Sequence, residues 1–327
     1  MYVVTGGAGF IGSNLVAELS DRGADVVVCD WLRSDERWRN LAKHDIVDLV
    51  APEALTGWLD RHREDVEAIV HMGAISSTTE TDVDLMVRDN VRFTLDLLQW
   101  CTGADRRLIY ASSAATYGDG SAGFEDAPGC APLSRLRPLN AYGWTKHFVD
   151  RRIARLAEQG MPLPPQWVGL KFFNVYGPNE YHKGSMRSLV AQNFAAVHRG
   201  DAVRLFRSRR ADYADGGQAR DFIYVKDCVG VISWLLRNPG VCGLFNVGTG
   251  VARSWLDLAQ ALFSAANRPA RIEFIDMPPQ LVEKYQYFTQ ASVARLRAAG
   301  YREAFTPLEQ GIADYVQQYL ARTDPYR

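Results

Sequence analysis

The chain has 327 residues and a formal net charge of −1, with 47% hydrophobic and 23% charged residues. This composition is typical of a globular protein and excludes a largely disordered chain. A net charge near zero gives no overall field that would draw the protein to nucleic acid or to a membrane surface. The sequence contains no run of about 18 apolar residues, so we expect no membrane span.

The five cysteines are scattered along the chain and comprise Cys29, Cys101, Cys130, Cys228 and Cys242. None lies in a C-x-x-C pair or has the spacing of a zinc site, so the sequence predicts no metal centre. An odd number of scattered cysteines is typical of reduced thiols in the cytosol. The opening residues, Met1–Gly6, show no basic leader followed by an apolar stretch, which favours a cytoplasmic protein without a secretory signal.

Short apolar runs alternate with longer mixed segments over the first two thirds of the chain. The expected strands are Tyr2–Thr5, Asp25–Asp30, Ala68–Met72, Arg107–Ser112, Gln166–Phe173 and Gly243–Val247. They lack polar alternation, as do strands that are buried on both faces of a parallel sheet. Helical patterns lie between them, including Gly12–Arg22 and Tyr142–Gln159. This order predicts an α/β protein with a Rossmann-type, doubly wound parallel sheet.

The rhythm changes after Asn174, where Pro178 and the polar stretch Arg207–Gln218 interrupt it, and a helix is expected over Leu308–Leu320. We therefore predict a smaller C-terminal substrate-binding α/β lobe. The dinucleotide-binding domain is expected to span residues 1–173 and about 220–248, and the substrate-binding lobe about 174–219 and 249–327.

A glycine-rich turn joins the first expected strand to the first helix. Its residues, Gly6–Gly12, fit both G-x-x-G-x-x-G and G-x-G-x-x-G. Glycine permits a tight turn and a close approach of backbone to a pyrophosphate, which the N-terminus of the following helix then holds. A purely structural turn is the alternative, but the strand before it and the helix after it favour a dinucleotide site.

Asp30 ends the second expected strand. A carboxylate there typically bonds the adenosine ribose hydroxyl and favours NAD. Arg33, Arg37 and Arg39 follow at once, and a guanidinium there could bind the 2′-phosphate of NADP. A solvated loop explains these arginines equally well. The residues alone therefore leave the choice between NAD and NADP open.

Tyr142 and Lys146 form a Y-x-x-x-K element. This spacing places the phenol and the ammonium on one face of a helix, where the positive charge favours the phenolate. Such a pair alone is often only a surface pair. Ser113 stands upstream at the end of an expected strand, after the glycine-rich turn, and the three parts together are a specific signal.

This arrangement resembles the extended short-chain dehydrogenase/reductase superfamily, which includes the nucleotide-sugar epimerases and dehydratases. The resemblance covers nearly the whole chain and is also carried by Val70–Ala74, Phe172–Pro178, Arg220–Asp227 and Phe245–Gly250. It implies that Ser113, Tyr142 and Lys146 form the catalytic triad. Ser113 would bond the reacting oxygen, Tyr142 would exchange its proton, and Lys146 would hold both Tyr142 and the cofactor.

The residues after Ser113 narrow the choice of reaction. Dehydratases of the superfamily carry an Asp-Glu pair there, whereas this chain has Ala114 and Ala115, which cannot act as acid or base. The segments that look like the ADP-glyceromanno-heptose 6-epimerases are Tyr110–Gly118, Glu180–Met186 and Tyr285–Gln290. The resemblance implies that the enzyme inverts C6 of an ADP-activated heptose by transient oxidation, in making the heptose precursor of lipopolysaccharide core.

Lys183 is the most telling residue of the second segment. Epimerisation takes hydride from one face of a carbon and returns it to the other, so an intermediate that turns in place needs a second acid/base. The lysine of this string has that role in the heptose epimerases, and the resemblance implies it for Lys183. The alternative is a loop lysine that is exposed or only binds phosphate. The resemblance assigns no chemistry to His182.

The resemblance also implies the cofactor and substrate contacts. The cofactor is expected to be NADP, with NAD as the alternative, and to contact Gly6, Gly9, Phe10, Ile11, Gly12, Asp30, Trp31, Arg37, Met72, Gly73, Ala74, Asn90, Lys146 and Val175. The ADP-sugar is expected to contact Asn174, Ser185, Gln192, Phe206, Arg220 and Tyr285. Arg220 suits a diphosphate because a guanidinium can form two parallel hydrogen bonds. A homo-oligomer, and within that subfamily a pentamer, is implied as well.

Two other interpretations stay open. A UDP-hexose 4-epimerase would use Tyr142 without Lys183. A non-catalytic dinucleotide sensor would keep the Rossmann fold for regulation, because fold alone does not prove function. Such sensors often lose the Ser–Tyr–Lys set, which this chain retains.

Overall fold

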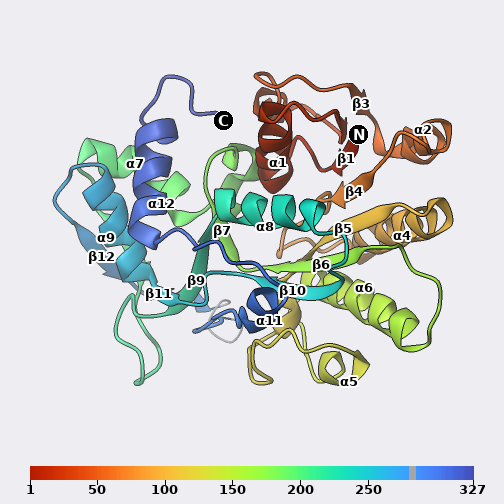
Figure 1. Cartoon of the computed structure of the whole chain (residues 1–327). Helices are drawn as coiled ribbons and strands as arrows, with labels where there is room; N and C mark the ends of the chain where they lie inside the picture. The colour runs from red at the N-terminus through yellow and green to blue at the C-terminus, as the bar shows by residue number, and fades with distance from the viewer. Residues whose placement is uncertain (280–284) are drawn as a thin grey trace.

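The computed structural model describes residues 1–279 and 285–327, which form two lobes (Figure 1). The larger lobe is built on a seven-stranded sheet with the order β10-β6-β5-β4-β1-β2-β3, in which every pair is parallel. Its strands are β1 (Tyr2–Thr5), β2 (Val26–Cys29), β3 (Asp48–Val50), β4 (Ala68–His71), β5 (Arg107–Ser113), β6 (Trp167–Phe172) and β10 (Gly243–Val247). The strand order reverses between β1 and β4, as in doubly wound sheets.

Helices cover both faces of this sheet because successive strand side chains point to opposite sides. Val4 packs in one core with the helices α1 (Phe10–Asp21) and α8 (Val225–Arg237). Val3 packs in a second core, on the other face, with α2 (Leu55–Arg61), α4 (Phe93–Ala104) and α6 (Ala141–Glu158). The predicted Rossmann-type fold is confirmed.

The predicted strands and helices of this lobe agree with the structure to within about two residues at each end, which is the usual uncertainty of an element boundary. Strand β3 was not predicted. Its residues Asp48 and Leu49 are exposed, since β3 is a short edge strand and shows no apolar run. The shorter segments of this lobe are η1 (Glu36–Asn40), η2 (Pro52–Ala54), α3 (Val83–Met86), η3 (Val87–Arg92), η4 (Ala114–Tyr117) and α5 (Cys130–Leu133).

Among the described residues, the smaller lobe combines two small sheets with the helices α7 (Leu189–Arg199), α9 (Trp255–Ala265) and α12 (Leu308–Tyr315). Strands β7 (Asn174–Tyr176) and β9 (Ala219–Tyr224) are parallel, β11 (Ala252–Ser254) is antiparallel to β9, and β8 (Val203–Phe206) pairs with β12 (Ile272–Ile275). Further helical segments are η5 (Tyr181–Met186), α11 (Ala294–Ala298) and η6 (Val316–Leu320). Val197, Leu262 and Ile312 join α7, α9 and α12 in one core.

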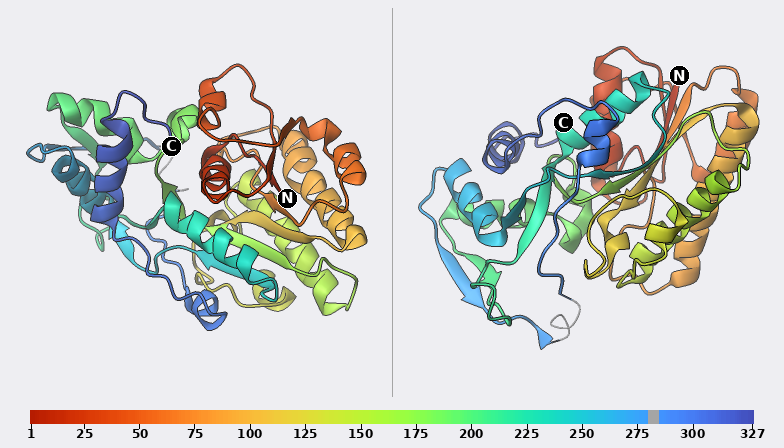
Figure 2. Two further views of the ribbon diagram at one scale, coloured as in Figure 1. Left: turned by 45° about the horizontal axis from the view of Figure 1, so that its top comes forward. Right: turned by 60° about the horizontal axis from the view of Figure 1, so that its bottom comes forward.

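The chain passes repeatedly between the lobes. β9 belongs to a sheet of the smaller lobe, whereas α8, directly after it, packs on α1 of the larger lobe. Both views of Figure 2 show the green-to-blue elements of the smaller lobe beside the red-to-orange strands and helices. The last residues return to the larger lobe, where Arg327 pairs with Glu18 of α1 at 2.9 Å. In the described part of the chain no helix has both the length and the apolar character needed to cross a bilayer.

Candidate active site

A cleft of about 1580 Å³ lies along the carboxyl ends of the parallel strands and is lined by both lobes. Ligands of doubly wound folds bind at this edge of the sheet, beside the point where the strand order reverses. The predicted site residues that line it are Gly6, Gly9, Phe10, Ile11, Gly12, Asp30, Trp31, Arg37, Met72, Gly73, Ala74, Ser113, Tyr142, Lys146, Asn174, Val175 and Lys183. Those that do not are Asn90, Ser185, Gln192, Phe206, Arg220 and Tyr285.

The glycine-rich turn forms a cradle that side chains would fill. Gly6 has a φ of +64°, and a Cβ there would lie 2.5 Å from the amide nitrogen of Gly73. A Cβ on Gly12 would lie 2.1 Å from the carbonyl oxygen of Gly6. Gly9 precedes α1 and offers no side-chain cap, so the first-turn amides of α1 keep their capacity to bind an anion. This geometry fits the pyrophosphate of a dinucleotide.

The end of β2 presents a carboxylate to the same cleft. Asp30 accepts hydrogen bonds from the backbone N–H groups of Ala8 at 3.0 Å and Trp31 at 2.8 Å. Burial raises the pKa of Asp30, and these two hydrogen bonds oppose that shift. Two carboxylate oxygens offer about four acceptor positions, so Asp30 retains capacity to accept hydrogen bonds from ribose hydroxyls.

The two arginines that line this end of the cleft differ in their contacts. Arg37 forms a two-point ion pair with Asp35, with Nε–Oδ1 and Nη2–Oδ2 distances of 2.8 and 2.6 Å. The Arg33 guanidinium lies 5.8 Å from the centre of the Trp31 ring, and no ion pair of Arg33 occurs among the described residues. Arg33 is therefore the less neutralised of the two cations.

Asn90 is fully buried and does not face the cleft. Its side chain accepts a hydrogen bond from the N–H of Ile75 at 2.8 Å and donates to the carbonyl of Ile75 at 3.0 Å. It also donates to the Thr145 hydroxyl on α6 at 3.2 Å. Asn90 thus fixes the loop after β4, which lines the cleft, against α6.

Helix α6 brings Tyr142 and Lys146 beside Ser113. The helix starts where it does because the Asn140 side chain accepts a hydrogen bond from the Gly143 amide at 2.8 Å. A Cβ on Gly143 would lie 2.6 Å from the carbonyl oxygen of Ala115. Gly143 was not among the predicted site residues, and its lack of a side chain allows α6 to approach the turn that follows Ser113.

The environment of this triad shifts its proton affinities. Burial raises the pKa of Tyr142, while a hydrogen bond with Ser113 acts in the opposite direction. Burial also lowers the pKa of Lys146 to about 8, and the Asp150 carboxylate opposes that shift. A bound ligand that adds positive charge beside Tyr142 would favour the phenolate.

Lys183 reaches the cleft from η5 in the smaller lobe. Its Nζ lies 5.1 Å from the centre of the Phe10 ring at the start of α1. Burial lowers the pKa of Lys183, while the Glu180 carboxylate opposes the shift. Gly184 directly after it leaves the helical conformation, with a φ of +54°.

The η5 segment is anchored by Glu180, which is completely buried. The Glu180 carboxylate accepts hydrogen bonds from the Ser188 hydroxyl at 2.6 Å and the Ser188 N–H at 2.5 Å. Ser188 also caps α7 through the N–H of Ala191. Glu180 and Ser188 therefore close the loop that carries Lys183. This pair was not predicted, because it matches no simple sequence motif.

Ser185 and Gln192 lie together beside this loop. Both side chains are exposed, and the Gln192 amide donates to the carbonyls of Ser185 at 3.1 Å and Arg187 at 2.6 Å. Gln192 thus holds the backbone after Lys183, and the structure does not place it in the wall of the cleft.

Phe206, Arg220 and Tyr285 form a second cluster in the smaller lobe. The Arg220 guanidinium lies 5.4 Å from the centre of the Tyr285 ring, and the rings of Phe206 and Tyr285 meet edge to face at 6.2 Å. Arg220 is only 6% exposed and donates to the carbonyls of Ala219 and Gln286. Burial lowers its pKa, and no ion pair of Arg220 occurs within residues 1–279 and 285–327. A buried cation that donates its hydrogen bonds to neutral carbonyls and lies against an aromatic ring is suited to an anionic ligand.

Several residues of the cleft were not predicted. The polar loop Ser76–Thr81 lines it, as do Gln286 and Thr289. Gln286 donates to the carbonyl of Gly118 at 2.6 Å and so ties the Tyr285 segment to the turn after β5. A run of hydroxyl residues is common in surface loops, which is why Ser76–Thr81 gave no signal of its own.

Comparison with known proteins agrees with this geometry. The family described as the NAD dependent epimerase/dehydratase family matches residues 2–248. The ADP-L-glycero-D-manno-heptose-6-epimerase of Nitratidesulfovibrio vulgaris (strain DP4) is 52% identical over 333 residues, covering 100% of both chains. The protein of that name from Fusobacterium nucleatum subsp. nucleatum is 42% identical over 335 residues, again covering 100% of both.

Two solved structures are similar over nearly the whole chain. The Helicobacter pylori ADP-L-glycero-D-manno-heptose-6-epimerase has a TM-score of 0.77 and 28% identity, with 97% of this chain and 95% of that chain covered. The Thermus thermophilus UDP-glucose 4-epimerase in complex with NAD has a TM-score of 0.74 and 27% identity, with 95% and 96% covered.

These findings confirm the predicted superfamily and the predicted resemblance to the heptose epimerases. They also confirm, at the level of the family, an epimerase-type enzyme that uses a nicotinamide dinucleotide. The chain belongs to the NAD dependent epimerase/dehydratase family.

Proposed function

We propose that this enzyme inverts C6 of an ADP-activated heptose, converting ADP-D-glycero-D-manno-heptose to ADP-L-glycero-D-manno-heptose. The observation that carries the proposal is that Tyr142 of the larger lobe and Lys183 of the smaller lobe line one cleft. The full-length relatives with 52% and 42% identity that bear the heptose-epimerase name support the substrate.

The chemistry divides between the cofactor and the protein. When bound, the nicotinamide ring would supply a hydride acceptor and donor at the reacting carbon. Tyr142 takes the proton of the C6 hydroxyl, Ser113 holds the reacting oxygen, and Lys146 stabilises the phenolate through its positive charge. The substrate then carries an aldehyde at C6.

The second half of the reaction needs the opposite face of that aldehyde. A turn about the C5–C6 bond directs the oxygen toward the smaller lobe, where Lys183 donates its own proton to it, and the hydride would return to C6 from the bound nicotinamide. Tyr142 then releases its proton to solvent and Lys183 takes one up, which restores both groups. The lowered pKa of Lys183 suits this role, because a general acid/base works best with a pKa near the working pH. No net oxidation occurs.

The nucleotide moiety of the substrate is assigned to the smaller lobe. Arg220 would bond the diphosphate, and Phe206 and Tyr285 would flank the nucleotide. Asn174 and Ser185 would contact the sugar side, while Gln192 acts through the loop backbone that it holds.

The cofactor is proposed to be NADP, bound along the glycine-rich turn, with Asp30 and Trp31 at the adenosine ribose. Arg33 supports this choice, because it lies at the adenosine end of the cleft and its charge could bind the 2′-phosphate. Arg37 supports it less, because Asp35 already neutralises its charge. The nicotinamide half would be lined by Met72, Gly73, Ala74 and Val175, and Asn90 would hold the loop after β4.

By resemblance we also propose that the enzyme is cytoplasmic and forms a homo-oligomer of five subunits. Light scattering can check the number of subunits.

The experiment that tests the proposal compares two substrates. The protein is incubated separately with ADP-D-glycero-D-manno-heptose and with UDP-glucose, and the products are followed by NMR. We expect inversion at C6 of the heptose and no reaction of UDP-glucose. Formation of UDP-galactose without reaction of the heptose would instead establish the UDP-hexose 4-epimerase, which the likeness to the Thermus thermophilus structure keeps as the second candidate.

A further inference from the structure

A buried ion pair lies beneath the catalytic residues of the larger lobe. Asp150 of α6 and Lys171 of β6 are 2.6 Å apart, and their side chains are 0% and 1% exposed. Neither residue lines the cleft, so neither touches substrate or cofactor in the mechanism above. The contacts of this pair nevertheless lead directly to Ser113.

The Asp150 carboxylate accepts hydrogen bonds from side chains of β5 and β6. Its Oδ1 accepts a hydrogen bond from the Tyr110 hydroxyl at 3.0 Å. Its Oδ2 accepts from the Ser112 hydroxyl at 2.7 Å and from Lys171 Nζ at 2.6 Å. Asp150 thereby fixes α6 to the residue immediately before Ser113.

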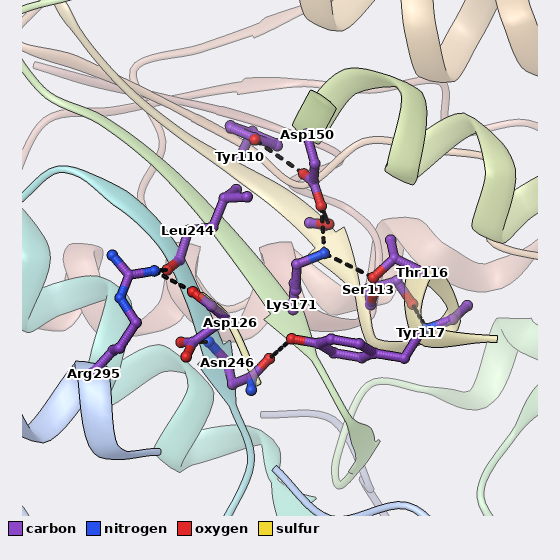
Figure 3. A network of polar contacts seen from close by, with 12 residues as sticks. Tyr110, Ser113, Thr116, Tyr117, Asp126, Asp150, Lys171, Leu244, Asn246 and Arg295 are labelled. Carbon is purple, nitrogen blue, oxygen red and sulfur yellow. Dashed lines mark hydrogen bonds and ion pairs between the residues drawn. The ribbon is translucent and has the colours of Figure 1, made fainter. Parts of the chain in front are cut away.

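Lys171 continues the connection on the other side of Ser113, as Figure 3 shows. It is the cross-strand neighbour of Ser112, and its Nζ donates to the Thr116 hydroxyl at 2.7 Å. The Thr116 hydroxyl donates in turn to the carbonyl of Ser113 at 2.9 Å. The strand end and the turn that hold Ser113 are therefore tied to one pair of charges.

The pair is also close to the acid/base residues along α6. Asp150 follows Lys146 by one helical turn and Tyr142 by two, which places it about 6 and 12 Å further along the helix axis. Charges at such distances interact appreciably where protein excludes water. A buried ion pair is weak evidence for stability, since apolar residues of similar volume are often as good. The hydrogen bonds that join this pair to Ser112 and Thr116 point instead to a role in positioning Ser113.

We propose that Asp150 and Lys171 are positioning residues for the proposed epimerase reaction, which hold Ser113 against α6 and keep the charge beneath Tyr142 and Lys146 balanced. The inference rests on the proposed function, in which Tyr142 exchanges a proton. The Asp150 carboxylate by itself raises the pKa of Tyr142 and of Lys146, and Lys171, 2.6 Å away, offsets part of that negative charge.

Other titratable groups face this region from every neighbouring element. On the sheet side these are His71 of β4, Tyr110 of β5 and Tyr117 of η4. From α6 and the segment before it come Lys146, His147 and Arg137. Next to Tyr117 lie Asp126 and Arg295, which donates to the Asp126 carbonyl. Burial lowers the pKa of His71 to about 3 and that of His147 to about 4. Both histidines are neutral at pH 7, so neither adds a charge beside Asp150 and Lys171.

The test is the pH dependence of kcat for the whole enzyme with ADP-heptose in four variants. We take the fall of kcat on the acid side of the profile to report protonation of the Tyr142 phenolate, and call it the acid limb. Lys171→Met leaves the Asp150 charge unbalanced, which raises the pKa of Tyr142, so the acid limb should move to higher pH by about 0.5–1 unit. Asp150→Asn leaves the Lys171 charge unbalanced, so the limb should move to lower pH by about the same amount. Lys171→Arg and the double variant Asp150→Asn/Lys171→Met preserve the balance, and their limbs should stay in place although kcat falls.

A purely structural role predicts something else, namely lower kcat in every variant with the limb unmoved or moved in one direction. That result would overturn the proposal. Thermal unfolding identifies a variant that does not fold. If Lys171→Met does not fold, the pH profile of the isosteric Asp150→Asn is compared with that of Lys171→Arg. Wild-type protein that leaves ADP-heptose unchanged would refute the proposed function instead, and the same profiles would then be measured with the sugar nucleotide that it does epimerise.

Discussion

The two walls of the cleft are built in different ways. The larger lobe presents Ser113, Tyr142 and Lys146 from a strand end and a capped helix, fixed by the buried charges of Asp150 and Lys171. The smaller lobe presents Lys183 from η5, next to a glycine with non-helical backbone angles and anchored by one buried carboxylate. The first wall is preorganised by many contacts, whereas the loop that carries Lys183 is anchored at Glu180 and Ser188.

The largest effect is expected on the larger-lobe wall. Tyr142→Phe removes one hydroxyl and leaves the packing of α6 intact, so kcat should fall roughly 10²–10⁴-fold, the usual scale for an acid/base group. Steady-state kinetics with ADP-heptose and thermal unfolding measure the two effects separately. Near-normal turnover by a folded variant would remove Tyr142 from the mechanism.

Much of this wall could be predicted from sequence because its signals are local. The strand, the glycine-rich turn and the helix follow one another directly, and Tyr142 and Lys146 lie one helical turn apart. The pairing of Asp150 with Lys171 could not be predicted, since it depends on how α6 lies on β6. Gly143 was missed for the same reason, because its need for space arises only from the nearby carbonyl of Ala115.

The smaller lobe was harder to predict, and Gln192 illustrates why. The resemblance suggested a substrate contact, yet its amide bonds the backbone of the Lys183 loop. Phe206, Arg220 and Tyr285 come from three separate segments and meet only because the Tyr285 segment runs beside β9, where the Ala219 N–H donates to the carbonyl of Tyr287 at 2.9 Å. Such contacts between distant segments leave no periodic signal.

Substitution in the cluster of Phe206, Arg220 and Tyr285 should change KM for the substrate more than kcat. Arg220→Met removes charge-assisted hydrogen bonds to the diphosphate, so KM for ADP-heptose should rise about 10- to 100-fold with kcat changed less. Arg204→Met is the matched control, because Arg204 lies on β8 with 69% of its side chain exposed and pairs with Glu273. A folded Arg220→Met variant with unchanged KM would exclude this cluster from substrate binding.

The adenosine end should show a smaller effect on cofactor choice. Arg33→Ala should weaken NADP about 2- to 10-fold and leave NAD affinity nearly unchanged, because only the 2′-phosphate requires the charge. Arg37→Ala should have the weaker effect, since Asp35 already neutralises Arg37. Competitive binding of both dinucleotides measures this, and preference for NAD with neither variant altering NADP affinity would leave the arginines as loop charges.

The smallest effect concerns stability in acid. His71 has a pKa of about 3 in the folded protein against an ordinary value of 6.5, so the unfolded chain binds more protons between these values. Its contribution to stability is therefore lost as the pH falls from 6.5 toward 3. Between pH 7 and pH 5 the free energy of unfolding should fall more for wild type than for His71→Gln. Equal losses would show that His71 is protonated in the folded protein.

The central claim is that each wall supplies one acid/base group, and Lys183 tests it most directly. The measurement is kcat and KM with ADP-heptose for Lys183→Met and Lys183→Arg, because arginine keeps the charge but cannot release a proton near neutral pH. We predict that both variants lose kcat by roughly 10²–10⁴-fold. An unchanged kcat in Lys183→Met with a raised KM, restored in Lys183→Arg, would show that Lys183 only binds phosphate and would contradict the account.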